Sequence, residues 1–175
     1  MIRAFAPLAM ALATLAAPAA MAMALTSTDI HPNATIAMAQ IYPRCGGDNI
    51  SPQLSWSGAP AGTKSFVLTL IDLDVKPAQW SHWIVVDLPA SATSLARGAK
   101  DLPAPAKAVV SNFGDPAYDG PCPPARSGVH HYQFTIWAMP TASFTIAPDA
   151  KASGLPALIS KQALDKASLT GSVTR

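Results

Sequence analysis

Two stretches of the chain, SFVLTLID (Ser65–Asp72) and VHHYQFTIWAM (Val129–Met139), alternate apolar and other side chains with a period of two. This period is typical of β-strands that turn one face toward a core. In the first stretch the apolar row ends at Asp72, and in the second it begins with His130 and Tyr132. Both strands are therefore predicted to place polar side chains where their inward-facing rows begin or end.

A third stretch, WSHWIVVDLP, predicts a strand over Ser81–Pro89. Strict alternation puts His82 at the start of one row, which then contains Ile84, Val86 and Leu88. Asp72, His82 and His130 are thus all expected at the ends of apolar rows, and we expect them to meet in one hollow together with the phenol of Tyr132.

Shorter patterns predict the rest of a mainly β fold. Short strands are expected at Leu54–Gly58, Ile36–Tyr42 and Ala108–Ser111, with a small edge piece at Ser143–Ile146. Apolar residues at helical spacing predict a short helix over Gly154–Ala167. Turns rich in proline and glycine separate these elements, so we expect a β-sandwich or barrel-like domain with short peripheral helices.

The composition is that of one globular domain. The chain has 175 residues, of which 50% are hydrophobic and 13% charged, enough to bury a substantial core. The formal net charge is only +2, and the lysines and arginines are scattered. A nucleic-acid binder needs a concentrated basic surface, so nucleic acid is excluded as a partner.

The N-terminus has the pattern of a secretory signal peptide over residues 1–24. Arg3 is followed by an apolar run and by small residues that allow cleavage before Met23 or Leu25. No stop-transfer segment follows, so we expect no membrane span after cleavage. The expected mature domain is 25–175, in the periplasm or secreted.

Export changes the reading of the two cysteines, Cys45 and Cys122. An even number of cysteines in a chain bound for an oxidising compartment favours a single disulfide. Such a bridge closes a long loop, with a stabilising effect of roughly 4 kcal/mol in the chain-entropy model. The alternative is two buried free thiols.

The polar strand ends admit several chemistries. Imidazoles and free backbone N–H groups of a glycine-containing loop can donate hydrogen bonds to an anion. In such a pocket Asp72 would fix the tautomer of a histidine or bind a ligand amine, and Trp80 or Tyr132 would form one wall. A metal triad lacks a ligand-spacing motif, and a hydrolase lacks a G-x-S-x-G nucleophile motif. Each histidine alone could also be a hydrogen-bonded residue at the edge of a core.

The order of four motifs resembles the phosphatidylethanolamine-binding protein family, in its bacterial Raf-kinase-inhibitor-like branch. The motifs are CGGDNISPQLSWSGAPAGTKSFVLTLIDLD, WSHWIVVDLPA, NFGDPAYDGPCPP and HHYQFTIWAM. The resemblance covers most of the mature sequence. It implies a β-sandwich with peripheral helices and a small pocket for the phosphate-like groups of phospholipid heads or for other anions.

The resemblance also implies a set of pocket residues. By their positions in the motifs these are Asp72, His82, Gly120, Pro121, His130 and Tyr132. The chain departs from the family pattern at Leu73, which stands in place of the first proline of D-P-D-x-P, at the displaced Pro77, and at His131, which replaces an arginine. We therefore expect a different backbone beside Asp72. The loop before Trp80 is short, and we expect it to widen the pocket or alter its selectivity.

The sequence thus predicts an exported, non-enzymatic domain that uses no cofactor and no metal. It is expected to bind small anionic or phosphorylated ligands at Asp72, His82, His130 and Tyr132, in a pocket bordered by Gly120, Pro121 and Trp80. The alternative is a protein-interaction module that inhibits a protease or another enzyme, as the family resemblance suggests. A hydrolase is the third hypothesis.

Overall fold

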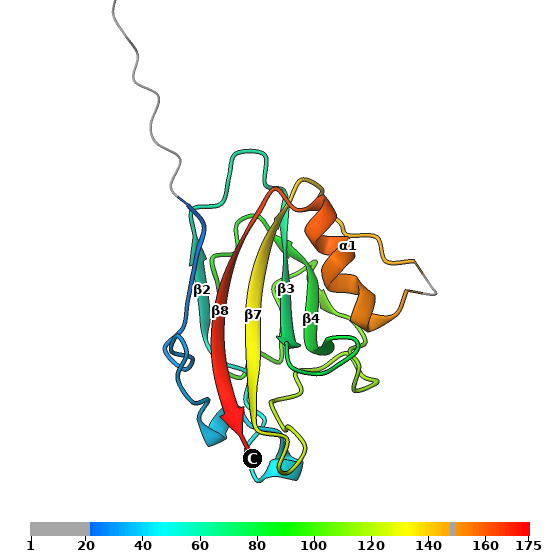
Figure 1. Ribbon diagram of the computed structural model, residues 1–175. Helices are drawn as coiled ribbons and strands as arrows, with labels where there is room; N and C mark the ends of the chain where they lie inside the picture. Colours follow the sequence, from blue (N-terminus) through cyan, green and yellow to red (C-terminus); the bar gives the residue numbers. More distant parts are fainter. Residues whose placement is uncertain (1–21, 148–149) are drawn as a thin grey trace, which may run out of the picture.

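Two antiparallel sheets form the protein, and the computed structural model describes them over residues 22–147 and 150–175 (Figure 1). The large sheet contains, in spatial order, β6 (Lys107–Ala108), β4 (Trp80–Pro89), β3 (Ser65–Asp72), β7 (Val129–Met139) and β8 (Asp165–Thr174). The small sheet contains β1 (Ala24–Thr26), β2 (Leu54–Ser57) and β5 (Ser94–Leu95). The helices are α1 (Leu155–Gln162) and the short turns η1 (Met38–Gln40), η2 (Pro43–Cys45) and η3 (Ala152–Gly154).

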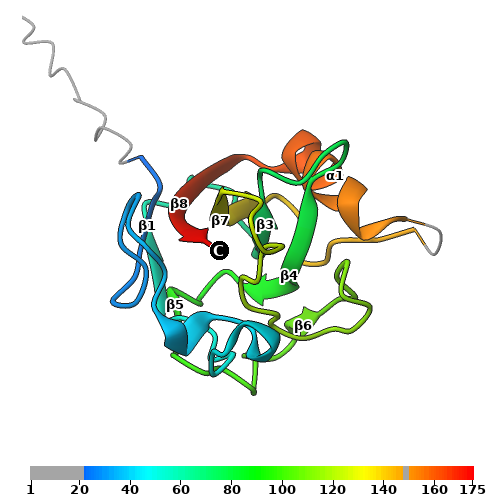
Figure 2. The same cartoon turned by 60° about the horizontal axis from the view of Figure 1, so that its bottom comes forward.

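The large sheet has a hydrophobic cluster on each face. On one face Leu68 and Phe134 pack in one cluster with Trp56 of the small sheet. On the other face Val67 packs in a second cluster that includes Ile159 of α1. Figures 1 and 2 show the corresponding layers, with the large sheet between the small sheet and α1. The mainly β sandwich with a peripheral helix is confirmed.

Strict alternation is wrong for β4. Leu70 of β3 pairs with Trp83, whereas the next residue, Ile71, pairs with Ser81, so His82 lies in a register shift. Such a bulge re-aims the side chains on either side of it. Trp83 belongs to the cluster between the sheets, and Ile84 belongs to the cluster under α1. His82 therefore does not begin the row of Ile84, Val86 and Leu88 that the sequence predicts.

The C-terminal segment is a long strand that the sequence analysis missed. The helix predicted over Gly154–Ala167 ends at Gln162, and β8 then pairs with β7 from Asp165 to Thr174. Small residues weaken the hydrophobic signal of this strand. Gly171 is required there because a Cβ atom would lie 2.6 Å from Cγ1 of Ile36, which packs against the strand.

Two other strand predictions are wrong. Ile36–Tyr42 contains the helical turn η1 rather than a strand. Ser143–Ile146 forms no strand, because the Phe144 N–H donates to the Asp87 carboxylate at 2.7 Å instead of to a sheet. The strand expected at Ala108–Ser111 is displaced to the two residues of β6.

None of the helices in the described part of the chain is long and apolar enough to cross a bilayer. The predicted signal peptide lies almost entirely outside the described residues, so its assignment stays a prediction.

Candidate functional site

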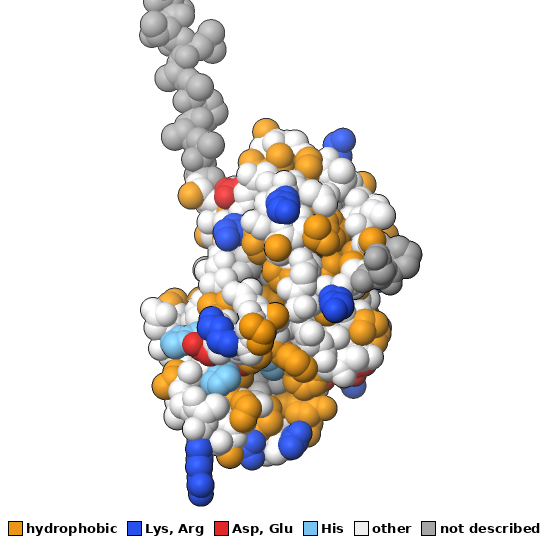
Figure 3. Space-filling model, turned by 45° about the vertical axis from the view of Figure 1, so that its right-hand side comes forward, with side chains coloured by type: hydrophobic (Ala, Val, Ile, Leu, Met, Phe, Trp, Pro, Cys, Tyr) orange, Lys and Arg blue, Asp and Glu red, His pale blue; other side chains and the backbone are white. Residues whose placement is uncertain are grey.

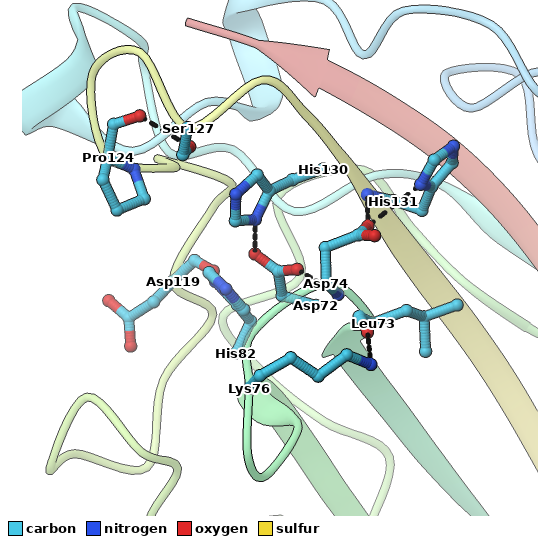
Figure 4. A network of polar contacts seen from close by, with 10 residues as sticks. All are labelled: Asp72, Leu73, Asp74, Lys76, His82, Asp119, Pro124, Ser127, His130 and His131. Atoms are coloured by element: carbon cyan, nitrogen blue, oxygen red, sulfur yellow. Dashed lines mark hydrogen bonds and ion pairs between the residues drawn. The ribbon is translucent and has the colours of Figure 1, made fainter.

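The last residue of β3, Asp72, is paired with a histidine of β7. Its Oδ2 lies 2.7 Å from Nδ1 of His130, and its Oδ1 accepts a hydrogen bond of 2.9 Å from the backbone N–H of Asp74 (Figure 4). Both partners are buried, with 2% of Asp72 and 6% of His130 exposed. An ionised carboxylate only accepts hydrogen bonds, so Nδ1 of His130 carries the proton. Asp72 thereby fixes the orientation of the ring and leaves Nε2 of His130 available for other contacts.

The second imidazole, His82, is held by a loop. Its Nδ1 lies 2.9 Å from the backbone carbonyl oxygen of Asp119 (Figure 4). A carbonyl only accepts, so Nδ1 is again the donor and Nε2 is left over. Burial lowers the pKa of His82 below its ordinary value, and the hydrogen bond to Asp119 opposes this only in part. His82 is therefore neutral in the free protein at neutral pH.

Tyr132 joins the two imidazoles. Its ring centroid is 5.2 Å from that of His82, in an edge-to-face arrangement, and 6.4 Å from that of His130, in a stacked one. The hydroxyl is buried and has no hydrogen-bond partner within the described residues. Burial, followed by the nearby Asp72 carboxylate, raises the pKa of Tyr132. The phenol is thus a buried, neutral O–H donor close to the Asp72 carboxylate.

The four side chains that the sequence predicted therefore converge. They pack tightly against one another and leave no open hollow between them. Asp72, His82 and Tyr132 each have no more than 3% of their surface exposed, so His130 is the most accessible of the four. Two surface cavities, of about 460 and 500 Å³, lie elsewhere, and none of the four side chains lines either of them.

The loop that borders the site is anchored at Gly120 and Pro121. A Cβ atom on Gly120 would lie 2.0 Å from the carbonyl oxygen of Gln40, so only glycine fits there. The Gly120 N–H donates to Oδ1 of Asn49 at 2.7 Å, and the Pro121 carbonyl accepts from the N–H of Tyr42 at 3.1 Å. The Gly120 N–H is consequently engaged and does not serve as a free donor.

A disulfide ties the same loop to η2. Cys45 and Cys122 are bonded, with their Cα atoms 5.6 Å apart, within the normal range for a bridge. The predicted pairing is confirmed, and the alternative of two free thiols is wrong.

An aromatic rim lies beside His82. The ring of Phe113 is 4.9 Å from the His82 ring, 5.2 Å from Tyr42 and 6.2 Å from Trp80. Trp80 and Phe113 are 39% and 36% exposed. Trp80 thus lies at the rim, and its nearest aromatic neighbour is Phe113 rather than Tyr132. Figure 3 shows exposed apolar side chains beside histidines in the lower half of the molecule.

Sequence reasoning did not assign Phe113, Asn49 or Asp119 to the site. All three lie in loops, where no periodicity points toward a face. The only available signals were the length of the Gly- and Pro-rich loop around Phe113 and the turn chemistry at Asn49.

His131 is exposed and lies apart from the four converging side chains, as alternation predicts. Asp74 Oδ2 accepts hydrogen bonds from the backbone N–H of His131 at 2.6 Å and from its Nδ1 at 2.9 Å (Figure 4). The backbone hydrogen bond is the main cause that lowers the pKa of Asp74. Two Asp–His pairs thus lie side by side, one buried and one exposed.

The geometry gives little support to the metal and hydrolase hypotheses. No group of three His, Cys, Asp or Glu side chains within residues 22–147 and 150–175 is arranged to hold a metal ion. The hydroxyl of Ser81, the serine next to His82, donates to Oδ1 of Asn112 at 2.7 Å. This serine is therefore not positioned as a nucleophile for His82.

Comparison with known proteins places this chain in a family. The family model described as phosphatidylethanolamine-binding protein matches residues 26–174. The YbcL protein of Escherichia coli is 37% identical over 153 residues, which cover 83% of this chain and 82% of YbcL. LppC of Mycobacterium tuberculosis, whose name describes it provisionally as a lipoprotein, is 35% identical over 91% of this chain and 76% of its own length.

Solved structures agree with the sequence matches. The crystal structure of E. coli YbcL, described as a new member of the mammalian PEBP family, superimposes with a TM-score of 0.80 and 31% identity, covering 87% of this chain and 98% of YbcL. The structure of CT736 from Chlamydia trachomatis gives a TM-score of 0.72 and 30% identity over 88% of this chain and 98% of CT736.

Proposed function

The chain belongs to the phosphatidylethanolamine-binding protein family, and on this premise we propose that it is a non-enzymatic domain that binds a small anionic or phosphorylated ligand at His82, His130 and Tyr132. One observation carries the proposal. Both imidazoles have Nδ1 committed to a protein acceptor, and the Tyr132 hydroxyl beside them has no acceptor. The Tyr132 hydroxyl lacks an acceptor, which an anion would supply. Nε2 of an imidazole accepts while the ring is neutral and donates to an anion only when the ring is protonated.

Asp72 has a positioning role in this proposal. Both of its oxygens are engaged, one by His130 and one by the Asp74 N–H, so neither is free for a ligand. It holds Nδ1 of His130, so Nε2 of that ring is the nitrogen left for a ligand. The Asp72 carboxylate contacts Nδ1 of His130, so the ligand contacts the opposite nitrogen of this ring and not the carboxylate.

Protonation of His82 is coupled to binding in this proposal. His82 is neutral in the free protein because burial lowers its pKa. An anion next to Nε2 favours the charged imidazole and raises that pKa. Binding therefore takes up a proton, and the ligand affinity increases as the pH falls.

Export is the second part of the proposal. A disulfide between Cys45 and Cys122 is typical of proteins that fold in an oxidising compartment. The signal-peptide pattern over 1–24 and the likeness to LppC point in the same direction. We take 25–175 as the mature domain, in the periplasm or secreted.

The aromatic rim favours one alternative function. Trp80 and Phe113 are large apolar side chains exposed beside the site, and aromatic residues of this kind are enriched in protein interfaces. A module that inhibits a protease or another enzyme would use this rim. A double Trp80→Ala, Phe113→Ala variant that binds phosphate normally but no longer inhibits its target would identify the alternative.

A binding titration tests the main proposal. Inorganic phosphate and phosphoethanolamine are titrated into the wild-type protein and into His130→Ala, and chemical shifts are followed. His131→Ala is the matched control, because His131 is the adjacent histidine and lies outside the pocket. We expect binding to be lost in His130→Ala and kept in His131→Ala. Equal binding by both variants would refute the pocket.

A further inference from the structure

A short exposed segment, residues 113–117, packs against the imidazole of His82, and we call it the lid. The ring centroid of Phe113, its first residue, is 4.9 Å from that of His82. The hydrogen bonds that the lid makes within the described chain all go to Ser111. A Cβ atom on Gly114 would meet nothing within 4 Å. The lid is therefore held to the rest of the protein by few contacts.

The chain on both sides of the lid is fixed. Before it, the Asn112 N–H donates to the hydroxyl and the carbonyl oxygen of Ser81 at 3.1 and 3.2 Å. After it, the Asn49 side chain donates to the carbonyl oxygen of Tyr118 at 3.0 Å and accepts from the N–H of Gly120 at 2.7 Å. A movement of this loop is therefore confined to the lid.

The residue that holds the His82 imidazole, Asp119, has a buried carboxyl group. Its backbone N–H and carbonyl oxygen both bond to His82, at 3.2 and 2.9 Å, and Figure 4 shows its carboxyl group on the side away from His82. Asp119 is only 4% exposed, and Oδ2 has no hydrogen-bond partner within the described residues. A buried carboxylate without donors is unfavourable, because nothing replaces its hydrogen bonds to water.

The acidic neighbour of this carboxyl group, Asp115, belongs to the lid. Neither acid forms a salt bridge in the described part of the chain. Burial, followed by Asp115, raises the pKa of Asp119 to about 7. Of the other titratable groups beside it, Tyr118 and His82 are uncharged at neutral pH, because burial raises the pKa of the phenol and lowers that of the imidazole. Among the described residues, no cation therefore balances an ionised Asp119.

We propose that Asp115 and Asp119 form an acid pair that keeps the lid closed over His82 while the pair holds a proton, and that the lid opens when both carboxyl groups are ionised. Opening moves Asp115 away from Asp119 and admits water to the buried carboxylate, which relieves both the repulsion and the loss of hydration. The ring of Phe113 leaves His82 together with the lid. The lid then sets how fast a ligand reaches His82, and this consequence alone rests on the proposed function.

Amide hydrogen exchange of the protein without ligand tests the acid pair. The Ser111 N–H donates to the carbonyl oxygen of Asp115 at 3.0 Å, and the open lid breaks this bond. Because the closed pair binds a proton more tightly than the open one, the opening constant should increase by up to about tenfold per pH unit between about pH 4 and 7. The protection factor of the Ser111 N–H should decrease accordingly and then level off. The N–H of Tyr42, which bonds to the fixed Pro121, should keep its protection.

Three variants complete the test. In Asp119→Asn the protection of the Ser111 N–H should not depend on pH, and in Asp115→Asn the dependence should be weaker than in the wild type. Asp101→Asn, which removes an exposed carboxyl group from another loop, should behave like the wild type.

A constant Ser111 protection factor in the wild type, or the same decrease in Asp119→Asn, would overturn the proposal. An equal loss of protection at Tyr42 would also overturn it, because it would show global unfolding instead of lid opening. A protein whose lid responds to pH in the expected way but does not bind phosphate would contradict the proposed function and leave the acid pair standing.

Discussion

The Asp72 carboxylate and the His130 imidazole form a buried pair, with Oδ2 and Nδ1 separated by 2.7 Å. The pair joins the end of β3 to the start of β7, two neighbouring strands whose register places Asp72 opposite Tyr132. One carboxylate thus sets the tautomer of one imidazole and the electrostatic environment of the phenol.

Asp72→Asn should weaken phosphate binding by about tenfold, which corresponds to roughly 1.4 kcal/mol. An amide can donate to Nδ1 of His130 as well as accept from it, so the ring is no longer held in one tautomer. Calorimetric titration measures the effect, and thermal unfolding checks that the variant folds. Unchanged affinity in a folded variant would show that the carboxylate does not position the imidazole.

Sulfate affinity should rise as the pH falls below about 6.5, the ordinary pKa of histidine. Burial lowers the pKa of His82 in the free protein, whereas the bound anion favours the protonated ring. Binding therefore takes up a proton at pH values between the free and the bound pKa of this ring. Sulfate keeps its charge over this range, which phosphate does not. An affinity that stays constant between about pH 5 and 7.5 would contradict this linkage.

Asp119→Asn should stabilise the protein above pH 7 by about 1 kcal/mol or more. Burial, and then the neighbouring Asp115, raise the pKa of Asp119 to about 7, so the folded state favours the protonated acid. Because the folded pKa exceeds the unfolded value, this group destabilises the fold as the pH rises from about 4 to 7.

Urea unfolding at several pH values measures this effect. The difference between the wild type and Asp119→Asn should grow over that pH interval and then level off. His82 has the opposite effect. Its pKa is lowered in the folded protein, so the free energy of unfolding decreases as the pH falls. A difference between the two proteins that does not vary with pH would show that Asp119 is ionised in the fold.

Gly120→Ala should destabilise the protein by about 3 kcal/mol. The added methyl group would lie 2.0 Å from the Gln40 carbonyl oxygen and 2.8 Å from the Tyr42 nitrogen, both of which are backbone atoms. Gly154→Ala is the control, because a Cβ atom there meets nothing within 4 Å. Equal stability of the two variants, measured by urea unfolding, would mean that the loop moves away from η1 without cost.

Alternation alone predicted much of the fold and three of the four central side chains. Asp72 and Tyr132 continue the inward rows of β3 and β7 because these strands pair without interruption up to that pair. His130 lies two residues before Tyr132 in β7, where the strand pairs regularly with β8. His82 was assigned to the site for the wrong reason. A register shift beside it, which a period of two cannot represent, turns its ring toward Tyr132.

The remaining errors share a physical cause. β8 is built from small side chains such as Ala167 and Gly171, and it is specified by pairing with β7 rather than by its own hydrophobicity. Phe113 and Asp119 reach His82 from a loop whose path is set by hydrogen bonds and a disulfide between distant segments. Contacts of this kind depend on tertiary structure and leave no periodic trace in the sequence.

The central claim is that His82 and His130 bind an anion through Nε2. The chain contains 4 histidines, so each imidazole can be followed by its own ¹⁵N signals during a titration with sulfate. We expect the Nε2 resonances of His82 and His130 to move together and to saturate, while those of His31 and His131 stay in place. Equal shifts of all the histidines, or none at His82 and His130, would contradict the account.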